Sequence, residues 1–498
     1  MLNYQDEFNK ITNEFGGTCD LRKIELTICG KSACFFYIDG YIDTLLFEDN
    51  ILSPLKNLQG DGQVTVDLLN QNTQMTTPIE ELTDTAKVIE YISAGEIVLL
   101  ADGSESFFKY SEKKYQLRSV AEPPVSTVLR GPREGFIEDL KTNMFLIRRR
   151  LATPKLTFEL LNVGKYTQTK VAIGFIDGVA DQQIVNRIKT QIKNIVIDGV
   201  IESSYIARYL EENKFSLFSH VGSSEKPDTV TAKMLEGRVA ILVDGSPSVL
   251  TLPFLMYENF QMSEDYYIKS YRATMVRIIR LFALIFSILM PGIYVALQEH
   301  QYQLFPIKYL VSVLGKISNI PLSPTLEMLL VLVIFEILNE TSIRMPRYVS
   351  MALSVVGAII LGEAAVTAGL FSISSVIIVA ISTVGVYCVP DEINSSSILR
   401  FGFVAVGGVL GLLGILLGMA GLVAYICSIN SYGVAYTSPF APSLMHDWQD
   451  GPIKAQLQEF GERPYSIPTD NRTRQRTQIA ENDGQENNEA NEWVTYGK

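Results

Sequence analysis

The first half of the chain alternates short apolar runs with polar turns, a pattern typical of the strands and helices of an α/β fold. Lys23–Thr27, Ala33–Ile38 and Glu96–Leu100 predict strands bounded by turn residues. Asp39-Gly40 directly follows the second of these runs and predicts a tight hairpin turn, because glycine readily accepts a positive φ.

Units made of a strand and an Asp-Gly turn recur along this half. Two units are 63 residues apart in its first part, and two more are 67 residues apart in its second part. Helical segments fill both gaps, for example Gln182–Ile195, whose isoleucines recur on one face. The pattern predicts two related α/β subdomains over about residues 20–115 and 165–255, although Asp-Gly turns are common enough for coincidence to be the alternative. The four turns are Asp39-Gly40, Asp102-Gly103, Asp177-Gly178 and Asp244-Gly245.

From about residue 274 the pattern changes to long apolar runs. A bilayer-spanning helix needs about 20 apolar residues. Leu304–Ile317 is shorter, contains two lysines and predicts an interfacial or re-entrant piece, which leaves open the side on which the C-terminus lies. The predicted spans lie at about 276–297, 325–343, 348–369, 372–389 and 401–428.

These patterns predict an α+β soluble N-terminal half, with two related α/β subdomains, followed by an all-α polytopic membrane domain. The tail from Tyr465 is polar and is predicted to be disordered. The four predicted regions are subdomain 1 over residues 1–125, subdomain 2 with a basic linker helix over 126–262, about five to six transmembrane helices over 263–430, and a polar C-terminal region over 431–498.

The junction between the halves predicts a helix that begins at Ser263, with Glu264 and Asp265 at its positive dipole end. Such a helix could run unbroken into the membrane and link the two halves mechanically. Basic residues at its near end indicate a cytoplasmic N-terminal domain by the positive-inside rule. They are Lys269, Arg272, Arg277 and Arg280.

Composition narrows the function. The net charge of −12 argues against nucleic-acid binding. The five cysteines and three histidines show no metal-ligand spacing, so we expect neither a metal nor another cofactor. No phosphate-binding loop and no catalytic triad motif is evident, so an enzyme is not expected. The N-terminus lacks the basic and apolar regions of a signal peptide, which also favours a cytoplasmic location for the first half.

One carboxylate stands in the apolar stretch between Tyr348 and Val389. Glu363 lies in a run of small residues, where a charge costs roughly 3 kcal/mol or more unless it is protonated, paired or wetted. A protonated glutamate that joins two helices is one interpretation. A pore-lining residue in an oligomer is the other. The pore-lining candidates on this face are Ile359, Glu363, Val366, Thr367 and Leu370.

The predicted span 325–343 carries several acidic residues. Glu336, Glu340 and Arg344 follow each other at four-residue spacing and share a face, and Glu327 lies nearer the start. Such a face cannot contact lipid, so it packs against protein or lines an aqueous path. Structural pairing and an ion path remain the two alternatives.

Basic residues also gather on the helix that follows residue 136. Arg148, Arg149 and Arg150 lie either on a solvated face or at a contact with another subunit or the membrane surface. With the junction residues they form the set of assembly or coupling candidates, which is Arg148, Arg149, Arg150, Glu264, Asp265 and Arg272.

A set of short motifs is spread over roughly residues 120–465. They are Arg130-Gly131-Pro132, Gly135-Phe136, Glu138, Asn143, Ile147–Arg150, Pro253–Tyr267, Arg344–Arg347, Gly362–Gly369, Ala441-Pro442 and Arg463-Pro464. Together these motifs resemble the A subunits of GerA-type spore-germination receptors. The family pattern usually has glutamine at the position of Glu363, and it has a histidine and a proline near the last span that residues 427–436 lack.

This resemblance implies a subunit of a nutrient receptor that triggers bacterial spore germination from the spore inner membrane. The implied partners are a transporter-like B subunit, a lipoprotein C subunit, further copies of the chain and membrane lipid, but not nucleic acid. The A subunit would oligomerise into a ligand-gated cation channel. The alternatives are a non-conducting scaffold that couples a cytoplasmic domain to a sensor subunit, and a secondary transporter.

Overall fold

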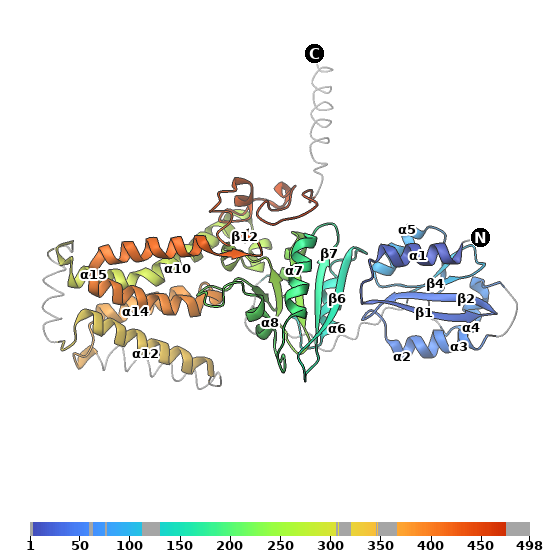
Figure 1. The fold of residues 1–498 in the computed structure, drawn as a ribbon, viewed down its shortest axis with the longest axis horizontal. Helices are drawn as coiled ribbons and strands as arrows, with labels where there is room; N and C mark the ends of the chain where they lie inside the picture. Colours follow the sequence, from blue (N-terminus) through green and yellow to red (C-terminus); the bar gives the residue numbers. More distant parts are fainter. Residues whose placement is uncertain are drawn as a thin grey trace, which may run out of the picture.

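The computed structural model describes residues 3–58, 63–74, 77–111, 130–304, 307, 320–344, 346 and 366–474. Two sheets and a helical bundle follow one another along the long axis of the molecule (Figure 1). The first sheet lies at one end, the second sheet in the middle and the bundle at the other end. We call the end of the bundle beside the second sheet its near end, and the opposite end its far end.

The first unit is an antiparallel sheet of order β1-β2-β4-β5-β3 with helices packed on it. Its elements are α1 (Tyr4–Glu14), β1 (Leu21–Ile28), β2 (Lys31–Ile38), α2 (Thr44–Phe47), η1 (Glu48–Leu52), α3 (Ser53–Lys56), α4 (Val66–Asn72), β3 (Glu80–Leu82), α5 (Thr85–Ser93), β4 (Ile97–Ala101) and β5 (Phe107–Tyr110).

The second unit repeats this order as β6-β7-β9-β10-β8, which confirms the predicted repeat. The predicted strand-and-turn units correspond to β2, β4, β7 and β9. Its elements are α6 (Leu140–Arg148), β6 (Leu156–Val163), β7 (Thr169–Ile176), α7 (Gln182–Lys193), α8 (Ser203–Leu210), β8 (Gly222–Ser224), α9 (Pro227–Leu235), β9 (Val239–Val243) and β10 (Val249–Leu252).

The predicted start of the repeat at residue 165 is too late. The second unit begins with α6, which precedes β6 as α1 precedes β1, so the predicted linker helix belongs to this unit. The strand β6 escaped prediction because its second half shows no regular alternation of apolar and polar residues: its exposed positions are one apolar and one polar residue, Leu160 and Asn162. The predicted boundary at 125–126 lies outside the described residues.

The hairpin predicted at Asp39-Gly40 is also wrong. The β1–β2 hairpin turns instead at Cys29-Gly30, both with positive φ (51° and 77°), as a two-residue hairpin loop requires. Asp39-Gly40 leads from β2 toward α2. A Cβ at Gly40 would come within 3.1 Å of the Cβ of Phe145 on α6, so glycine permits close approach of the two units there.

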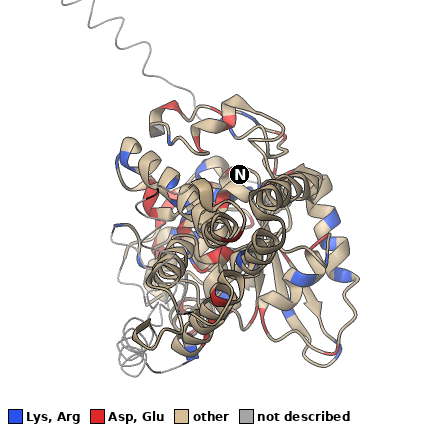
Figure 2. Ribbon diagram, turned by 90° about the vertical axis from the view of Figure 1, so that its left-hand side faces the viewer, with Lys and Arg blue, Asp and Glu red and all other residues tan. Residues whose placement is uncertain are grey.

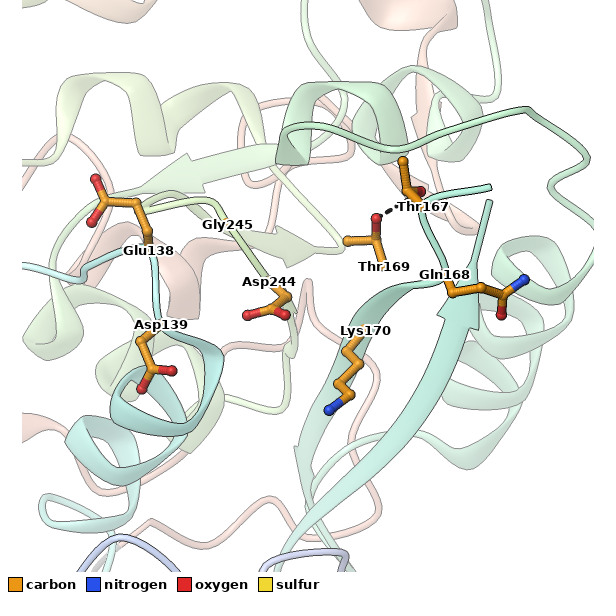
Figure 3. Close-up of a pocket in the computed structure, with 8 residues that line it drawn as sticks. All are labelled: Glu138, Asp139, Thr167, Gln168, Thr169, Lys170, Asp244 and Gly245. Atoms are coloured by element: carbon orange, nitrogen blue, oxygen red, sulfur yellow. Dashed lines mark hydrogen bonds between the residues drawn. The ribbon is translucent and has the colours of Figure 1, made fainter. Parts of the chain in front are cut away.

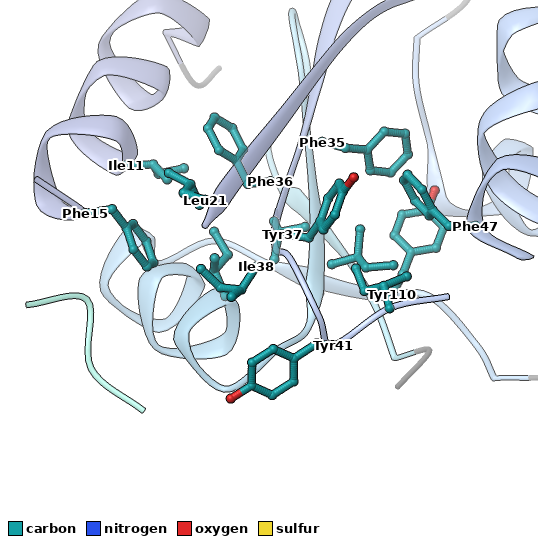
Figure 4. Packing of buried hydrophobic residues seen from close by; sticks show 14 of the residues in the cluster. Ile11, Phe15, Leu21, Phe35, Phe36, Tyr37, Ile38, Tyr41, Phe47 and Tyr110 are labelled. Atoms are coloured by element: carbon teal, nitrogen blue, oxygen red, sulfur yellow. The ribbon is translucent and has the colours of Figure 1, made fainter. Parts of the chain in front are cut away.

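A continuous apolar core runs from the first unit into the second. Aromatic side chains dominate its first part (Figure 4). The ring of Phe35 lies 5.3 Å from that of Phe47 and 5.7 Å from that of Tyr110, both edge-on. Such pairs contribute about 0.5–1.5 kcal/mol beyond the area they bury. The core thus holds the two sheets together and not only each sheet to its helices.

The bundle is built from α10 (Ser270–Glu299), α12 (Pro324–Arg344), α14 (Ile373–Val386) and α15 (Ile393–Ser428). Among the described residues, two helices are long and apolar enough to cross a membrane, Ser270–Glu299 and Pro390–Ser428. α14 is a shorter apolar helix. Seen from the far end, the helices carry few charged residues along most of their length (Figure 2). The predicted span 348–369 lies largely outside the described residues.

α15 is a helical hairpin and not the single predicted span. Gly411 has φ 62° and ψ −152°, which breaks the helix into a first leg, residues 393–410, and a second leg, residues 412–428. A Cβ at Gly418 would lie 3.1 Å from the Phe403 ring, so the two legs pack side by side. Each leg spans roughly 26 Å at about 1.5 Å per residue.

Contacts at the far end fix the course of the chain through the bundle. Glu299, at the end of α10, accepts hydrogen bonds from the amide (3.0 Å) and hydroxyl (2.7 Å) of Thr325 at the start of α12. The predicted interfacial piece Leu304–Ile317 lies mostly outside the described residues, but its two flanks are therefore held together at this end. Glu327 in turn accepts from the amide of Ser372 (2.7 Å), which precedes α14.

The C-terminal segment, residues 429–474, returns to the second unit. Ser431, in the small β11–β12 hairpin (Asn430–Ser431 and Val434–Ala435), donates to the backbone oxygen of His220 (3.0 Å). Disorder from Tyr465 onward was predicted, which is wrong up to residue 474. Thr469 forms a β-bridge with Ala180, and this backbone pairing orders the polar stretch around Thr469.

Gly411→Ala tests the hairpin. The backbone angles at this position are available essentially to glycine alone, and a Cβ would lie 2.8 Å from Nε2 of Gln301. We expect the free energy of unfolding of the solubilised protein to fall by about 1–3 kcal/mol. Gly421→Ala, where a Cβ meets nothing within 4 Å, is the control and should leave it unchanged or higher. Equal effects at both sites would contradict the break at Gly411.

Candidate functional site

A buried group of charges joins the α/β half to the bundle. Asp265 lies in the 3-10 turn η3 (Ser263–Tyr266), just before α10. Its carboxylate accepts from Nε of Arg277 (3.1 Å) and from Nη1 and Nη2 of Arg280 (2.8 and 3.1 Å). Asp265 and Arg277 are each only 1% exposed. The near end of α10 is thus tied to the turn that precedes it.

The C-terminal segment completes this group. Nη1 of Arg277 donates to the carboxylate (3.0 Å) and backbone oxygen (2.9 Å) of Asp450, and to the oxygen of Gly451 (2.9 Å). The Tyr266 hydroxyl donates to the other oxygen of Asp450 (2.8 Å). Burial and the nearby carboxylate raise the pKa of Tyr266, which keeps its hydroxyl a neutral donor. We call Asp265, Tyr266, Arg277, Arg280 and Asp450 the junction cluster.

A second buried set lies where the second sheet meets the junction. Nη2 of Arg238 donates to Glu258 (2.9 Å), and Nζ of Lys233 lies 2.7 Å from the other oxygen of Glu258. Burial alone would raise the pKa of Glu258, but these two cations outweigh it and lower the pKa. Glu258 stands in the turn η2 (Met256–Phe260) between β10 and α10. Ion pairs therefore connect the turn η2 to α9, through Lys233, and to the residue before β9, Arg238.

Three junction residues were predicted for coupling. Asp265 lies at the centre of the cluster. Glu264, which is half-buried, and Arg272, which is exposed, both lie outside it. Sequence reasoning assigned Arg277 and Arg280 only to membrane topology. Their three-residue spacing, which places both on one helix face, was the available signal. Because both are buried on carboxylates, they support the positive-inside argument less than exposed cations would.

The basic helix predicted for assembly makes contacts within the chain. Arg148 is fully buried and donates from Nε (2.9 Å) and Nη2 (2.8 Å) to Asp20 of the first unit. It therefore joins the two units and is not on a solvated face. Arg149 and Arg150 are partly buried, and both pair with Glu134 in the segment before α6.

The Arg130-Gly131-Pro132 motif lies against the junction. Gly131 has φ 124°, and a Cβ there would come within 2.7 Å of the Tyr267 ring. The Tyr267 hydroxyl donates to Asp228 at the start of α9 (2.8 Å). Gly131 therefore permits a contact that any side chain would block.

The acidic residues of α12 do not share one role. Glu327 is 1% exposed and caps the start of α14 through Ser372. Glu340 and Arg344 form the expected pair at 2.5 Å on an exposed surface. Glu336 lies 3.5 Å from Nη2 of Arg400. Each of these acidic residues therefore has a partner within the chain, and the choice between structural pairing and an ion path stays a prediction.

Arg400 is a buried residue that sequence reasoning missed, because it lies just before the predicted last span. It is 4% exposed within the bundle and belongs to the first leg of α15. Its Nη1 donates to the hydroxyl of Thr383 on α14 (3.2 Å). With Glu336 it links α12, α14 and α15 by polar contacts.

The predicted pore-lining set is only partly described. Ile359 and Glu363 lie outside the described residues. Val366 is half-buried, whereas Thr367 and Leu370 are exposed, just before Ser372 at the far end of the bundle.

A hollow of about 480 Å³ lies on the second unit. Its polar side chains do not converge on one point (Figure 3). Asp139 caps α6 by accepting from Thr142, and Asp244 accepts from the amide of Leu140 (3.4 Å). Its lining comprises Glu138, Asp139, Thr167, Gln168, Thr169, Lys170, Asp244 and Gly245.

Comparison with known proteins identifies the family to which this chain belongs. A family profile described as Bacillus/Clostridium GerA spore germination protein matches residues 9–466. The chain belongs to this family. Spore germination protein KA of Bacillus subtilis (strain 168) is 33% identical over 446 residues, which cover 88% of this chain and 81% of that protein. GerLA of Bacillus cereus is 30% identical over 481 residues, covering 95% and 97% respectively.

Two further similarities of this GerA family member are to a second Bacillus subtilis protein and to a solved structure. The Bacillus subtilis protein YfkQ, described as an uncharacterized membrane protein, is 34% identical over 87% of this chain and 86% of its own length. The crystal structure of the N-terminal domain of the A subunit of the Bacillus megaterium spore germinant receptor GerK3 aligns with 50% of this chain and 94% of that one. The TM-score is 0.39 and the identity 25%.

Asp265→Asn tests the junction cluster. The substitution keeps the size of the side chain but leaves two buried guanidinium groups without their shared carboxylate. We expect the free energy of unfolding to fall by about 3–5 kcal/mol, measured as thermal unfolding of the solubilised protein. The adjacent Glu264→Gln is the control and should change it by less than about 0.5 kcal/mol. An Asp265 variant as stable as this control would contradict the proposed importance of the cluster.

Glu134→Gln tests the pairs with Arg149 and Arg150 through pH. Burial alone would raise the pKa of Glu134, but hydrogen bonds from both arginines lower it below its ordinary value of 4.5. A carboxylate whose pKa is lower in the folded state stabilises that state fully when the pH is above its ordinary pKa. This stabilisation is lost as the pH falls through the pKa of the folded state. The stability difference between wild type and variant should therefore be largest near neutral pH and shrink below about pH 4.5.

Denaturant unfolding at a series of pH values measures this difference. Replacing Arg149 and Arg150 together by alanine should remove most of the effect of Glu134→Gln, because the interaction is then already lost. A difference that grows as the pH falls would refute the assignment.

Proposed function

We propose that this chain is the A subunit of a nutrient germinant receptor and that several copies form a ligand-gated cation channel in the spore inner membrane. The two α/β units lie in the cytoplasm, and α10, α12, α14 and α15 belong to the membrane domain. A transporter-like B subunit and a lipoprotein C subunit complete the receptor. Membership of the GerA family and the similarity to the spore germination proteins KA and GerLA support the receptor assignment.

One observation carries the proposed coupling. The 30-residue helix α10 is bonded at both ends: the junction cluster holds its near end, and Glu299 holds the start of α12 at its far end. Because the helix continues through Pro291, a displacement of the α/β units moves the bundle at its far end, close to Thr367. This is a mechanical path from the α/β half toward the predicted pore face.

The alternatives differ in what crosses the membrane. A non-conducting scaffold would use the same linkage to move another subunit. A secondary transporter would bind its substrate near the middle of the bundle, commonly at the interface of inverted repeats. Arg400 contacts Glu336 and Thr383, so these polar side chains of the bundle already have partners within the chain. They give no specific support to a substrate site.

Conductance of the purified protein in planar bilayers separates these functions. We expect cation conductance from the wild type, lower cation preference in Glu363→Gln, and smaller conductance in Thr367→Leu, because the leucine is larger and apolar. Thr341→Leu on α12, a threonine outside the predicted pore-lining set, is the matched control and should conduct normally. Absence of conductance in every condition would favour the scaffold, and saturable flux of a nutrient would favour the transporter.

A further inference from the structure

The loop between α8 and β8 reaches from the second unit into the near end of the bundle. The amide of Leu217 donates to the Tyr425 hydroxyl (3.3 Å), and the hydroxyl of Ser395 donates to the Leu217 oxygen (2.8 Å). Ser395 belongs to the first leg of α15 and Tyr425 to the second. The loop is therefore bonded to both legs of the hairpin.

Its packing shows how deep the loop reaches. Leu217 and the buried Phe218 pack in one apolar cluster with Leu399 of the first leg and Leu422 of the second. Leu422 lies six residues before the end of α15 at Ser428, roughly 9 Å at about 1.5 Å per residue. Leu217 is thus seated within the near end of the hairpin, between apolar helices.

The tip of the loop stands out from this packed position. Phe215, two residues before Leu217, is 98% exposed. The backbone of this turn is held in place, because the amide of Phe215 donates to the side chain of Asn213 (3.1 Å) and the amide of Ser216 donates to the Asn213 oxygen (3.1 Å). Lys214 beside it is also exposed. The turn therefore presents the Phe215 ring outward, two residues from the point where Leu217 enters the near end of the apolar hairpin.

The charges around the tip suit a lipid surface. The nearby Glu212 is paired with Arg187 on α7 at 2.7 Å, so its charge is compensated within the protein. Phenylalanine and lysine both occur in segments that lie at a lipid interface, because the apolar ring enters the boundary of the acyl chains and the ammonium group stays with the phosphates.

We propose that Phe215 and Lys214 form a membrane-interface anchor that docks the second α/β unit onto the bilayer surface. The inference rests on the proposed membrane location of the bundle. The anchor adds to the junction cluster a second point of attachment, on lipid instead of on α10, so it fixes the orientation of the unit over the membrane.

Fluorescence quenching tests this anchor in the full chain. Trp448 and Trp493 are replaced by phenylalanine, and Phe215→Trp provides a single probe in vesicles of phosphatidylethanolamine and phosphatidylglycerol. We expect bromines placed near the headgroups to remove about half of its emission, and bromines near the chain ends to remove less, as for a residue at the interface.

Two matched probes make each outcome decisive. Phe282→Trp, at an exposed position on the bundle helix α10, serves as the probe for a residue in lipid. Leu45→Trp, at an exposed position on α2 of the distant first unit, serves as the probe for a residue in water. Quenching at 215 and 282 but not at 45 supports the anchor. Quenching at 282 alone overturns it and leaves the proposed function standing, and a blue-shifted, unquenched probe at 215 would indicate another subunit as its partner. Absence of quenching at both 215 and 282 overturns the membrane location and the anchor with it.

Discussion

The carboxylate of Asp265, shared by two buried arginines, is the interaction on which the arrangement of the two halves depends. Removing charges from water costs several kcal/mol per ion, so the cluster is stable only when every partner is in place. The members of the cluster come from a turn, from α10 directly after it, and from the C-terminal segment, whose Asp450 lies 173 residues from Arg277. A shift of any of them exposes or unpairs a buried charge, which makes the junction rigid and suited to transmitting motion.

The α/β half uses the same physics to hold its repeated units together. Arg148 and Asp20 form a buried pair between them, inside an apolar core that both units share. The two units therefore behave as one rigid body. The pair of Glu258 with Arg238 connects this body to the turn η2, which precedes α10. Together these ion pairs give a continuous connection from the first sheet to the bundle.

Much of the fold was predictable because local pattern determines it. Strands β2, β4, β7 and β9 followed from short apolar runs ending at Asp-Gly, and α10 followed from its apolar length. The hairpin of α15 was missed because glycines were interpreted as tight-packing residues, and only backbone angles distinguish Gly411 from the others. The C-terminal segment looked disordered because its order comes from bonds to the second unit and not from its own apolar content.

The sequence by itself determined the family, the division into an α/β half and an apolar helical half, the internal repeat and Asp265 as a residue of the junction. Only the tertiary structure decided the partners of the charges. The sequence suggested surface or topological roles for Arg148, Arg277 and Arg280 and none for Arg400, yet all four are buried on acceptors from other elements of the chain. Burial and pairing depend on contacts between residues that lie up to 174 positions apart, and no local pattern encodes them.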